Sequence, residues 1–265
     1  MTAIGRLART VGLVRREALP FGCRWDDDLV ALGHVPAVVF DVGANIGQTV
    51  RSVHARFPEA VVHAFEPVPS TYRTLVDSVG GRPSVRTVQA ALSDHDGVAE
   101  MTDEPLSELN TLLTASRPDQ ATVTVPMRTL DSYAEERGVG RISLLKIDTE
   151  GHELAVLRGA QEALRAGTID FILAECDFTE RPGMPHTPFC DLLAHLHPLG
   201  YRVVTFYSHG VDDEGWIWGD VLFMRAGATT RSRSTSFRPW PAFDLPRRRQ
   251  RAPAAATAAP RSPRG

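Results

Sequence analysis

The stretch that most constrains the fold is residues 38–49, VVFDVGANIGQT, an apolar run that ends at a carboxylate and then at two glycines. The run has the composition of a buried strand, and the two glycines after it are typical of a tight turn that opens a helix. In this arrangement, backbone N–H groups and a helix N-terminus can face a bound ligand. We therefore expect a nucleotide-type pocket formed by Asp41, Gly43, Ala44, Asn45 and Gly47.

The glycine spacing argues against a dinucleotide. A dinucleotide-binding turn has the pattern G-x-G-x-x-G, in which a helix glycine admits the pyrophosphate. Here Asn45 stands at the second glycine position, and no glycine follows Gly47 in the predicted helix. A second acidic strand end, Glu66-Pro67, comes 25 residues after Asp41, near the offset of about 20 residues at which a carboxylate accepts hydrogen bonds from ribose hydroxyls. Glu66 is the predicted ribose ligand, with Pro67 beside it; an ordinary strand-to-helix turn is the alternative for the glycines alone.

Four motifs occur in order along the chain: FDVGANIGQT, FEPVPSTY, TLDSY and LLKIDTEGHELAVLRGA. Together they resemble the FkbM family of S-adenosylmethionine-dependent methyltransferases, over roughly residues 38–225. The resemblance implies an α/β class I methyltransferase (Rossmann-like) fold, a three-layer sandwich with a seven-stranded, mostly parallel sheet whose last strand is antiparallel. It also implies S-adenosylmethionine as cofactor and, as acceptor, a hydroxyl of a sugar, polysaccharide or secondary metabolite.

The adenine side of the pocket is expected after the third predicted strand, residues 85–91. This strand leads to Leu92-Ser93-Asp94, where the fold places the groups that hold adenine. A flat heterocycle needs an apolar slot with one or two polar contacts. Ala91 and Leu92 are therefore the expected neighbours of the ring, and plain sheet core is the alternative for either residue.

The segment KIDTEGHE, residues 146–153, carries the strongest signal for the acceptor side. Lys146 and Asp148 alternate with Ile147, so on a strand they share one face. A lysine near the end of a core strand is costly to bury unpaired, so Lys146 either pairs with a carboxylate that supports the turn or helps to place cofactor or substrate. An alcohol acceptor needs a base that removes its proton or a metal that lowers its pKa. The candidate bases are Asp148, Glu150 and His152.

Acidic residues end several of the predicted strands. Because parallel strands direct their carboxyl ends to one edge of a sheet, Asp41, Glu66, Asp148 and Glu175 should share one rim. Glu175 and Asp177 could join Asp148 in a carboxylate set for Mg²⁺, which takes oxygen ligands. We favour a metal-free base over this metal site.

The chain divides into three predicted parts. Residues 1–36 form an N-terminal helical segment, residues 37–225 the methyltransferase domain, and residues 226–265 a disordered tail rich in Arg and Pro. Helices are expected around residues 4–16 and 26–32 and over 152–166, and Ser70 and Thr129 are predicted N-caps. Residues 105–120 form a long connection, and loops of this length are often functional. The FkbM resemblance places a polar pair at Asn110-Thr111, which we expect to contact the acceptor; a disordered surface loop is the alternative.

Charge and cysteine content bear on partners and compartment. The net charge is −3, but nine Arg and one Asp give residues 226–265 a charge of +8, which leaves −11 for the first 225 residues. An acidic body disfavours nucleic acid. Methylation of nucleic acid, with the basic tail as the binding arm, is therefore kept only as an alternative, and a catalytically inactive cofactor-binding module is another.

Three cysteines without C-x-x-C spacing argue against a disulfide framework or a zinc site. We expect a cytoplasmic protein without a membrane span, with a small-molecule or glycan acceptor.

Overall fold

The computed structural model describes residues 19–102, 122–180, 186–213 and 215–228. The predicted helix at residues 4–16, the predicted acceptor contact Asn110-Thr111 and nearly all of the predicted tail lie outside these ranges. In the described part of the chain, no helix combines the length and the apolar character needed to cross a membrane.

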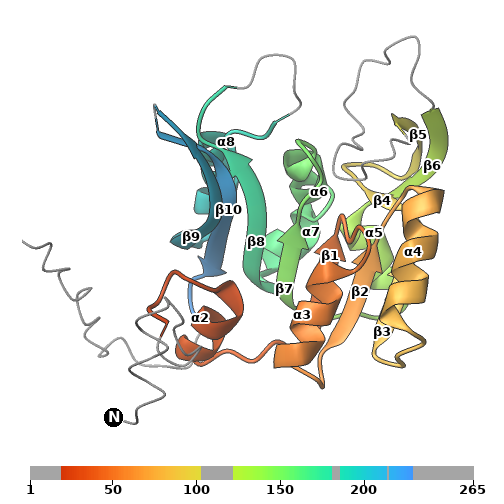
Figure 1. Ribbon diagram of the computed structural model, residues 1–265, viewed down its shortest axis with the longest axis horizontal. Helices are drawn as coiled ribbons and strands as arrows, with labels where there is room; N and C mark the ends of the chain where they lie inside the picture. Colours follow the sequence, from red (N-terminus) through yellow and green to blue (C-terminus); the bar gives the residue numbers. More distant parts are fainter. Residues whose placement is uncertain (1–18, 103–121, 181–185, 214, 229–265) are drawn as a thin grey trace, which may run out of the picture. The chain divides into compact units, whose positions relative to one another are not determined.

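A seven-stranded sheet lies at the centre of the fold (Figure 1). In spatial order its strands are β3 (Val85–Val88), β2 (Val61–Phe65), β1 (Val38–Val42), β7 (Ile142–Ile147), β8 (Ile169–Asp177), β10 (Gly215–Arg225) and β9 (Tyr201–Asp212). The neighbouring strands from β3 to β8 pair in parallel, whereas β10 is antiparallel to both β8 and β9. The predicted seven-stranded sheet with an antiparallel last strand is therefore confirmed.

Helices cover both faces of this sheet (Figure 1). One face is covered by α2 (Trp25–Ala31), α3 (Gln48–Arg56) and α4 (Pro69–Val79), and the other by α5 (Leu130–Arg137), α6 (Glu153–Arg158), α7 (Gln161–Ala166) and α8 (Phe189–Leu196). Consecutive strand residues point to opposite faces, so Val39 of β1 packs in the core under α3 while Phe40 packs in the core under α5. The predicted three-layer sandwich follows from this alternation.

A second, three-stranded sheet flanks the large one. Its strands are β4 (Ala91–Leu92), β6 (Thr122–Arg128) and β5 (Gly97–Thr102), in that order. The predicted strand over residues 85–91 is wrong in extent, because β3 ends at Val88, opposite the last residue of β2. The chain then leaves the large sheet, and Ala91 and Leu92 pair with β6 instead.

The predicted helix over residues 152–166 consists of two shorter helices, α6 and α7, which are separated at Gly159. The backbone of Gly159 lies against Ser93, and a Cβ at position 159 would lie 1.9 Å from the Ser93 carbonyl oxygen. The carboxylate of Asp131 accepts hydrogen bonds from two backbone N–H groups at the start of α7, at 2.8 and 3.0 Å. These bonds satisfy donors that a helix start leaves without intrahelical partners, so the break is stabilised from outside the helix.

One predicted N-cap is confirmed and the other is wrong. The Thr129 hydroxyl accepts a hydrogen bond from the Ser132 N–H at 3.0 Å and caps α5. Ser70, in contrast, lies inside α4, which begins at Pro69 after Val68. Proline suits the first helical position because it lacks the N–H that would have no partner there.

We predict that Gly159→Ala lowers the free energy of unfolding by about 2 kcal/mol or more, because the new methyl group overlaps a backbone oxygen that cannot move freely. Gly140→Ala is the matched control, since a Cβ at position 140 has no heavy atom within 4 Å. Urea unfolding of both variants measures the effect. Equal stability of the two variants would contradict this account of the helix break.

Candidate functional site

The carboxyl ends of β1, β2, β7 and β8 meet at one edge of the large sheet. Asp41 lies in β1 and Glu175 in β8, whereas Glu66 and Asp148 come directly after β2 and β7. The prediction that these four carboxylates share one rim is confirmed by the parallel pairing of their strands.

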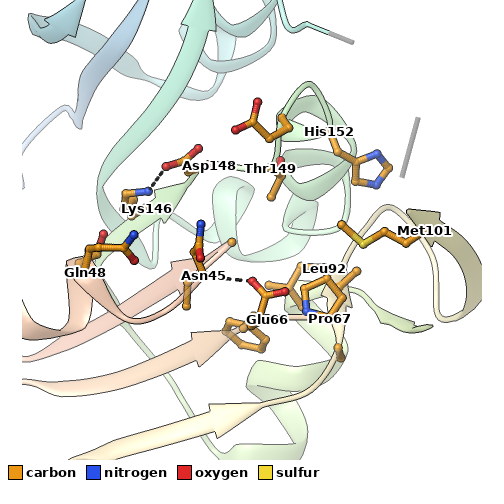
Figure 2. Close-up of a pocket in the computed structure, with 17 residues that line it drawn as sticks. Asn45, Gln48, Glu66, Pro67, Leu92, Met101, Lys146, Asp148, Thr149 and His152 are labelled. Carbon is orange, nitrogen blue, oxygen red and sulfur yellow. Dashed lines mark hydrogen bonds and ion pairs between the residues drawn. The ribbon is translucent and has the colours of Figure 1, made fainter. Parts of the chain in front are cut away.

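A cavity of about 300 Å³ opens at this edge (Figure 2). The predicted cofactor-binding and catalytic residues, except Asp41 and Gly47, line it: Gly43, Ala44, Asn45, Glu66, Pro67, Ala91, Leu92, Lys146, Asp148, Glu150 and His152. Six further residues line the cavity that were not predicted from the sequence: Gln48, Thr49, Phe65, Ala90, Met101 and Thr149. Most of these are chain neighbours of predicted residues, whereas Met101 comes from β5 and has no such local signal.

The turn after β1 uses its backbone N–H groups within the protein. The N–H groups of Gly43 and Ala44 donate to the Phe65 carbonyl at 3.1 and 2.9 Å, and that of Asn45 donates to Glu66 at 3.1 Å. The expectation that these N–H groups face a ligand is therefore wrong. The helix that follows, α3, begins at Gln48 without a side-chain cap.

Gly43 is required by its conformation and by its surroundings. Its φ of +78° belongs to the left-handed region that favours glycine, and a Cβ there would lie 1.8 Å from the Asp148 carbonyl oxygen. The turn after β1 thus lies directly on the end of β7. Gly47 does not line the cavity; it precedes α3 with a φ of +86° and lies against Ser78 of α4.

Glu66 faces the cavity with a buried carboxylate. One oxygen accepts the Asn45 N–H at 3.1 Å and the other accepts the Val68 N–H at 3.0 Å. Burial raises the pKa of Glu66 to about 7, and these two hydrogen bonds oppose the rise. Each oxygen keeps a lone pair for a further donor, which is what a ribose ligand must offer.

Asp41 lies beneath the cavity rather than in its wall. It is fully buried, and neither carboxylate oxygen has a hydrogen-bond partner among the residues that the structure describes. Burial raises the pKa of Asp41 to about 7, although the positive charge of Lys146 opposes the rise. Asp41 and Lys146 are register partners on β1 and β7, so they share one face of the sheet.

Lys146 and Asp148 form an ion pair at the end of β7, with the Lys146 Nζ donating to an Asp148 oxygen at 2.7 Å (Figure 2). The Lys146 side chain is 11% exposed and that of Asp148 is 40% exposed, so the lysine supports a carboxylate that remains accessible. Burial acts to lower the pKa of Lys146, but the charges of Asp148 and Asp41 outweigh it and raise that pKa. Lys146 therefore stays charged.

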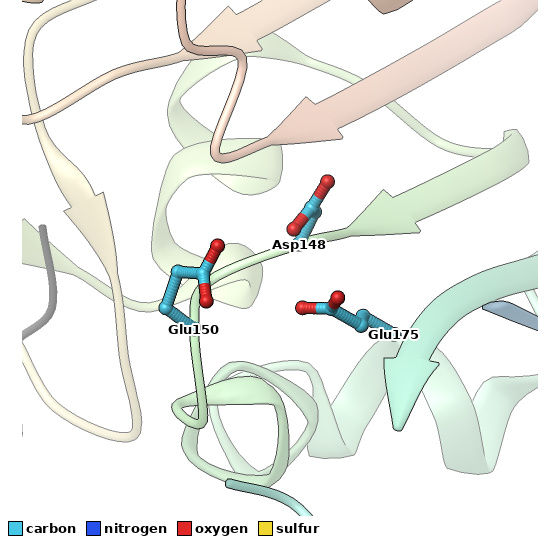
Figure 3. Close-up of side chains that lie close together, drawn as sticks. All are labelled: Asp148, Glu150 and Glu175. Atoms are coloured by element: carbon cyan, nitrogen blue, oxygen red, sulfur yellow. The ribbon is translucent and has the colours of Figure 1, made fainter. Parts of the chain in front are cut away.

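Three carboxylates gather beside this pair. Asp148, Glu150 and Glu175 each offer an oxygen, and these oxygens lie within 4.8 Å of one another (Figure 3). Burial, followed by the charges of Asp148 and Glu150, raises the pKa of Glu175 to about 9, so Glu175 is protonated near neutral pH. Asp177, which the sequence analysis placed in this set, is not part of the group.

The turn between β7 and α6 is held from below by Glu153. One oxygen of this buried carboxylate accepts hydrogen bonds from the Thr149 N–H, the Thr149 hydroxyl and the Gly151 N–H, and the other accepts from the Thr187 hydroxyl. Glu150, at the top of the turn, has a φ of +52°, which is unusual for a residue with a side chain. Glu153 thus keeps Glu150 in a conformation that turns it toward the cavity.

His152 lies at the far side of the cavity from Lys146, toward Met101 and Leu92 (Figure 2). Its Nε2 is 3.0 Å from the Ser93 hydroxyl. Burial lowers the pKa of His152 against the opposing charge of Asp94, so the imidazole is neutral at pH 7. The cavity therefore has a charged side at the end of β7 and a largely uncharged side next to β4.

The seven-stranded sheet, with helices on both faces and a mixed polar and apolar cavity at its carboxyl edge, defines a class I methyltransferase fold. The family model for the methyltransferase FkbM domain matches residues 41–203. The chain belongs to this family.

Three relatives show how far the similarity extends. The 31-O-demethyl-FK506 methyltransferase FkbM of Streptomyces tacrolimicus is 36% identical over 48% of this chain and 60% of its own length. The hexuronic acid methyltransferase AglP of Haloferax volcanii is 30% identical over 52% of this chain and 55% of its own length. The 2-O-methyltransferase NoeI of Sinorhizobium fredii is 25% identical over 70% of this chain and 78% of its own length. For the first two, the match spans little more than half of the relative.

The buried Asp41 predicts an unusual dependence of stability on pH. Because its pKa is higher in the folded protein than the ordinary value of 3.8, the folded state binds more protons between these values, and stability falls as pH rises through them. Asp41→Asn cannot titrate. Wild type should therefore lose about 1–3 kcal/mol more free energy of unfolding than Asp41→Asn when the pH rises from about 5 to about 8.

Chemical denaturation at the two pH values provides the measurement. Asp77→Asn, at an exposed position of α4, is the control and should show the wild-type pH dependence. If Asp41→Asn also follows wild type, Asp41 is not the buried proton-binding group described above.

Proposed function

We propose that this protein is an S-adenosylmethionine-dependent O-methyltransferase that acts on a hydroxyl of a sugar, polysaccharide or secondary metabolite. The observation that carries the proposal is that Glu66 and the paired Lys146 and Asp148 line one cavity beside the Gly43 turn. The proposed ribose-binding carboxylate and a candidate base thus line the same cavity of a chain that belongs to the FkbM family.

The cavity residues suit the parts of the cofactor. Glu66 has lone pairs for the ribose hydroxyls, and Ala91, Leu92 and Met101 offer an apolar wall for adenine. Bound S-adenosylmethionine supplies a methyl group on a positively charged sulfur. The acidic side of the cavity favours a cationic ligand, because nearby negative charges lower its free energy.

The names of the relatives support oxygen as the acceptor atom. One relative is named for a 31-O position, one for a 2-O position and one for hexuronic acid. The first two names specify an oxygen position, and a hexuronic acid offers hydroxyl oxygens as well as a carboxylate. An acceptor of this class is what we propose here.

Asp148 is the proposed base. It is the accessible partner in the ion pair with Lys146. Lys146 can therefore hold the carboxylate in place while a carboxylate oxygen of Asp148 accepts a hydrogen bond from the hydroxyl of the acceptor substrate. An alcohol is a weak nucleophile until its proton is removed, and holding the acceptor oxygen in line with the methyl carbon supplies much of the acceleration. Glu150 and His152 also line the cavity and are the remaining candidate bases.

A divalent cation is the less favoured alternative. The group of Asp148, Glu150 and Glu175 offers oxygen ligands of the kind that Mg²⁺ takes. However, the Lys146 ammonium already occupies an oxygen of Asp148 at 2.7 Å and would repel a second cation. We therefore prefer a base that acts without a metal.

The test of the proposed function is release of S-adenosylhomocysteine from S-adenosylmethionine in the presence of a panel of sugars, uronic acids and hydroxylated metabolites. We expect product only with acceptors that carry a free hydroxyl, and mass spectrometry should place the methyl group on oxygen. Methylation of RNA or DNA alone, or of no acceptor, would contradict the proposal.

For the cofactor site, we predict that Glu66→Ala weakens S-adenosylmethionine binding about tenfold or more, because the ribose hydroxyls lose a charged acceptor worth ~1.5–3 kcal/mol. Calorimetry measures the affinity, and melting temperature shows whether the variant folds. Glu59→Ala, at an exposed position, is the control and should bind like wild type. Binding of NAD in place of S-adenosylmethionine would show that the cofactor is wrongly assigned.

For the acceptor site, we predict that Asp148→Asn lowers the single-turnover rate about 10²-fold or more, the usual size of a lost acid–base contribution. Affinity for S-adenosylmethionine should change little, because the amide keeps the shape of the side chain. Asp213→Asn, in the turn between β9 and β10, is the matched control and should keep the wild-type rate.

Two further measurements separate the alternatives. If Asp148 only supports the turn, Asp148→Asn should keep turnover near normal and lower the melting temperature and cofactor affinity together. EDTA should leave the wild-type rate unchanged if the base acts without a metal. Loss of activity with EDTA and its recovery with Mg²⁺ would favour the carboxylate group as a metal site.

A further inference from the structure

A second cavity, of about 580 Å³, lies at the opposite edge of the large sheet. Its walls include Val38 and Val61, the first residues of β1 and β2, and the segment from Glu136 to Arg141 that joins α5 to β7. Parallel strands begin at this edge and end at the first cavity, which is lined by Glu66 and Asp148 and is the proposed cofactor cavity. The two cavities are therefore separated by the length of the strands. We call this second site the arginine cavity, after Arg86, Arg137 and Arg141 in its wall.

The three arginines are only partly compensated by carboxylates. Arg141 forms an ion pair with Asp170 through two hydrogen bonds. Arg137 lies 3.4 Å from Glu136, but Glu136 also accepts a hydrogen bond from Arg128 at 2.5 Å. The wall of the cavity therefore carries more positive than negative charge.

Arg86 is the least compensated of the three. It projects from β3 and is exposed, and it forms no ion pair with any residue that the structure describes. A guanidinium presents a planar set of donors that matches phosphate and carboxylate oxygens. Arg86 is thus able to bind an anion without first breaking an internal contact.

Buried His63 identifies where two of these charges converge. It lines the cavity with 3% of its surface exposed, and its Nδ1 is 2.8 Å from the Tyr133 hydroxyl. Burial and then the charges of Arg86 and Arg137 lower the pKa of His63 to about 4. Both guanidinium groups therefore act on the same imidazole, although they come from β3 and from the end of α5.

We propose that the arginine cavity binds the phosphate or carboxylate group of a small-molecule anion, held by Arg86 and Arg137 beside His63. Its volume is in the range of about 300–1,000 Å³ that is typical of small-molecule sites, so it has room for more than the anionic group alone. The site is independent of the cofactor cavity and does not rest on the proposed function.

The test uses the full-length protein and follows the imidazole signals by NMR while inorganic phosphate, or acetate in a second series, replaces chloride at constant ionic strength. The His63 signal is assigned by its contact with Tyr133. We expect saturable perturbation of this signal and a rise in the pKa of His63, because a bound anion favours the imidazolium. Phosphate stronger than acetate would identify a phosphate group, and the reverse a carboxylate.

Three variants test the assignment of the arginines. Arg86→Gln and Arg137→Gln should each weaken anion binding about tenfold, the effect of losing one charged hydrogen bond, and Arg86→Gln removes no ion pair with the described residues, so it should fold normally. Arg202→Gln, at an exposed position of β9, should bind like wild type. The proposal is overturned if His63 of wild type does not respond saturably, or if all three variants bind equally.

Discussion

The close approach of Gly43 to the carbonyl oxygen of Asp148 sets the geometry of the proposed cofactor cavity. A Cβ at position 43 would lie 1.8 Å from that oxygen, so the turn after β1 can lie on the end of β7 only because the residue is glycine. Two N–H groups of the same turn donate to the Phe65 carbonyl, and the Asp148 N–H donates to the Val42 carbonyl. These bonds join the ends of β1, β2 and β7. Glu66 and Asp148, which follow two of these strands, line one cavity as a result.

Charge around the end of β7 is balanced by a single lysine. Lys146 is the only lysine in the chain, and its neighbours include Asp41, Asp148 and Asp220. Burial raises the pKa of Asp41 to about 7 and that of Asp220 to about 6, and the positive charge of Lys146 only partly opposes both rises. The protein therefore keeps buried carboxylates whose ionised form costs folding free energy. A cationic ligand such as the proposed cofactor would offset this cost, which gives a physical reason for placing carboxylates where they weaken the empty protein.

Much of the site could be predicted because its residues follow strands directly. The apolar runs before Asp41, Glu66 and Asp148 mark buried parallel strands, and parallel strands bring their ends together whatever lies between them. What the sequence could not predict depends on pairing between distant segments. Ala91 pairs with β6 instead of the large sheet because the neighbouring strand β2 has already ended. Met101 reaches the cavity from β5. Hydrophobic periodicity indicates which face of a strand is buried, not which strand lies beside it, nor that the N–H groups of a glycine turn bond to a neighbouring carbonyl.

Carboxylates gather at the carboxyl edge of the large sheet and arginines at its amino edge, and this difference follows partly from the direction of the chain. Helices that connect parallel strands end near the amino edge of the sheet, and the negative end of the helix dipole favours cations there. Arg56 and Arg137 lie in the last turns of α3 and α5, as this effect predicts, and Asp131 and Glu153 lie in the first turns of α5 and α6. The dipole does not account for Arg86, which lies on a strand, or for Arg141, which precedes β7. Arg141 is paired with Asp170, whereas Arg86 lines the same cavity as Arg137 without capping a helix and without an ion pair to the described residues. The proposed anion would compensate the charge of Arg86.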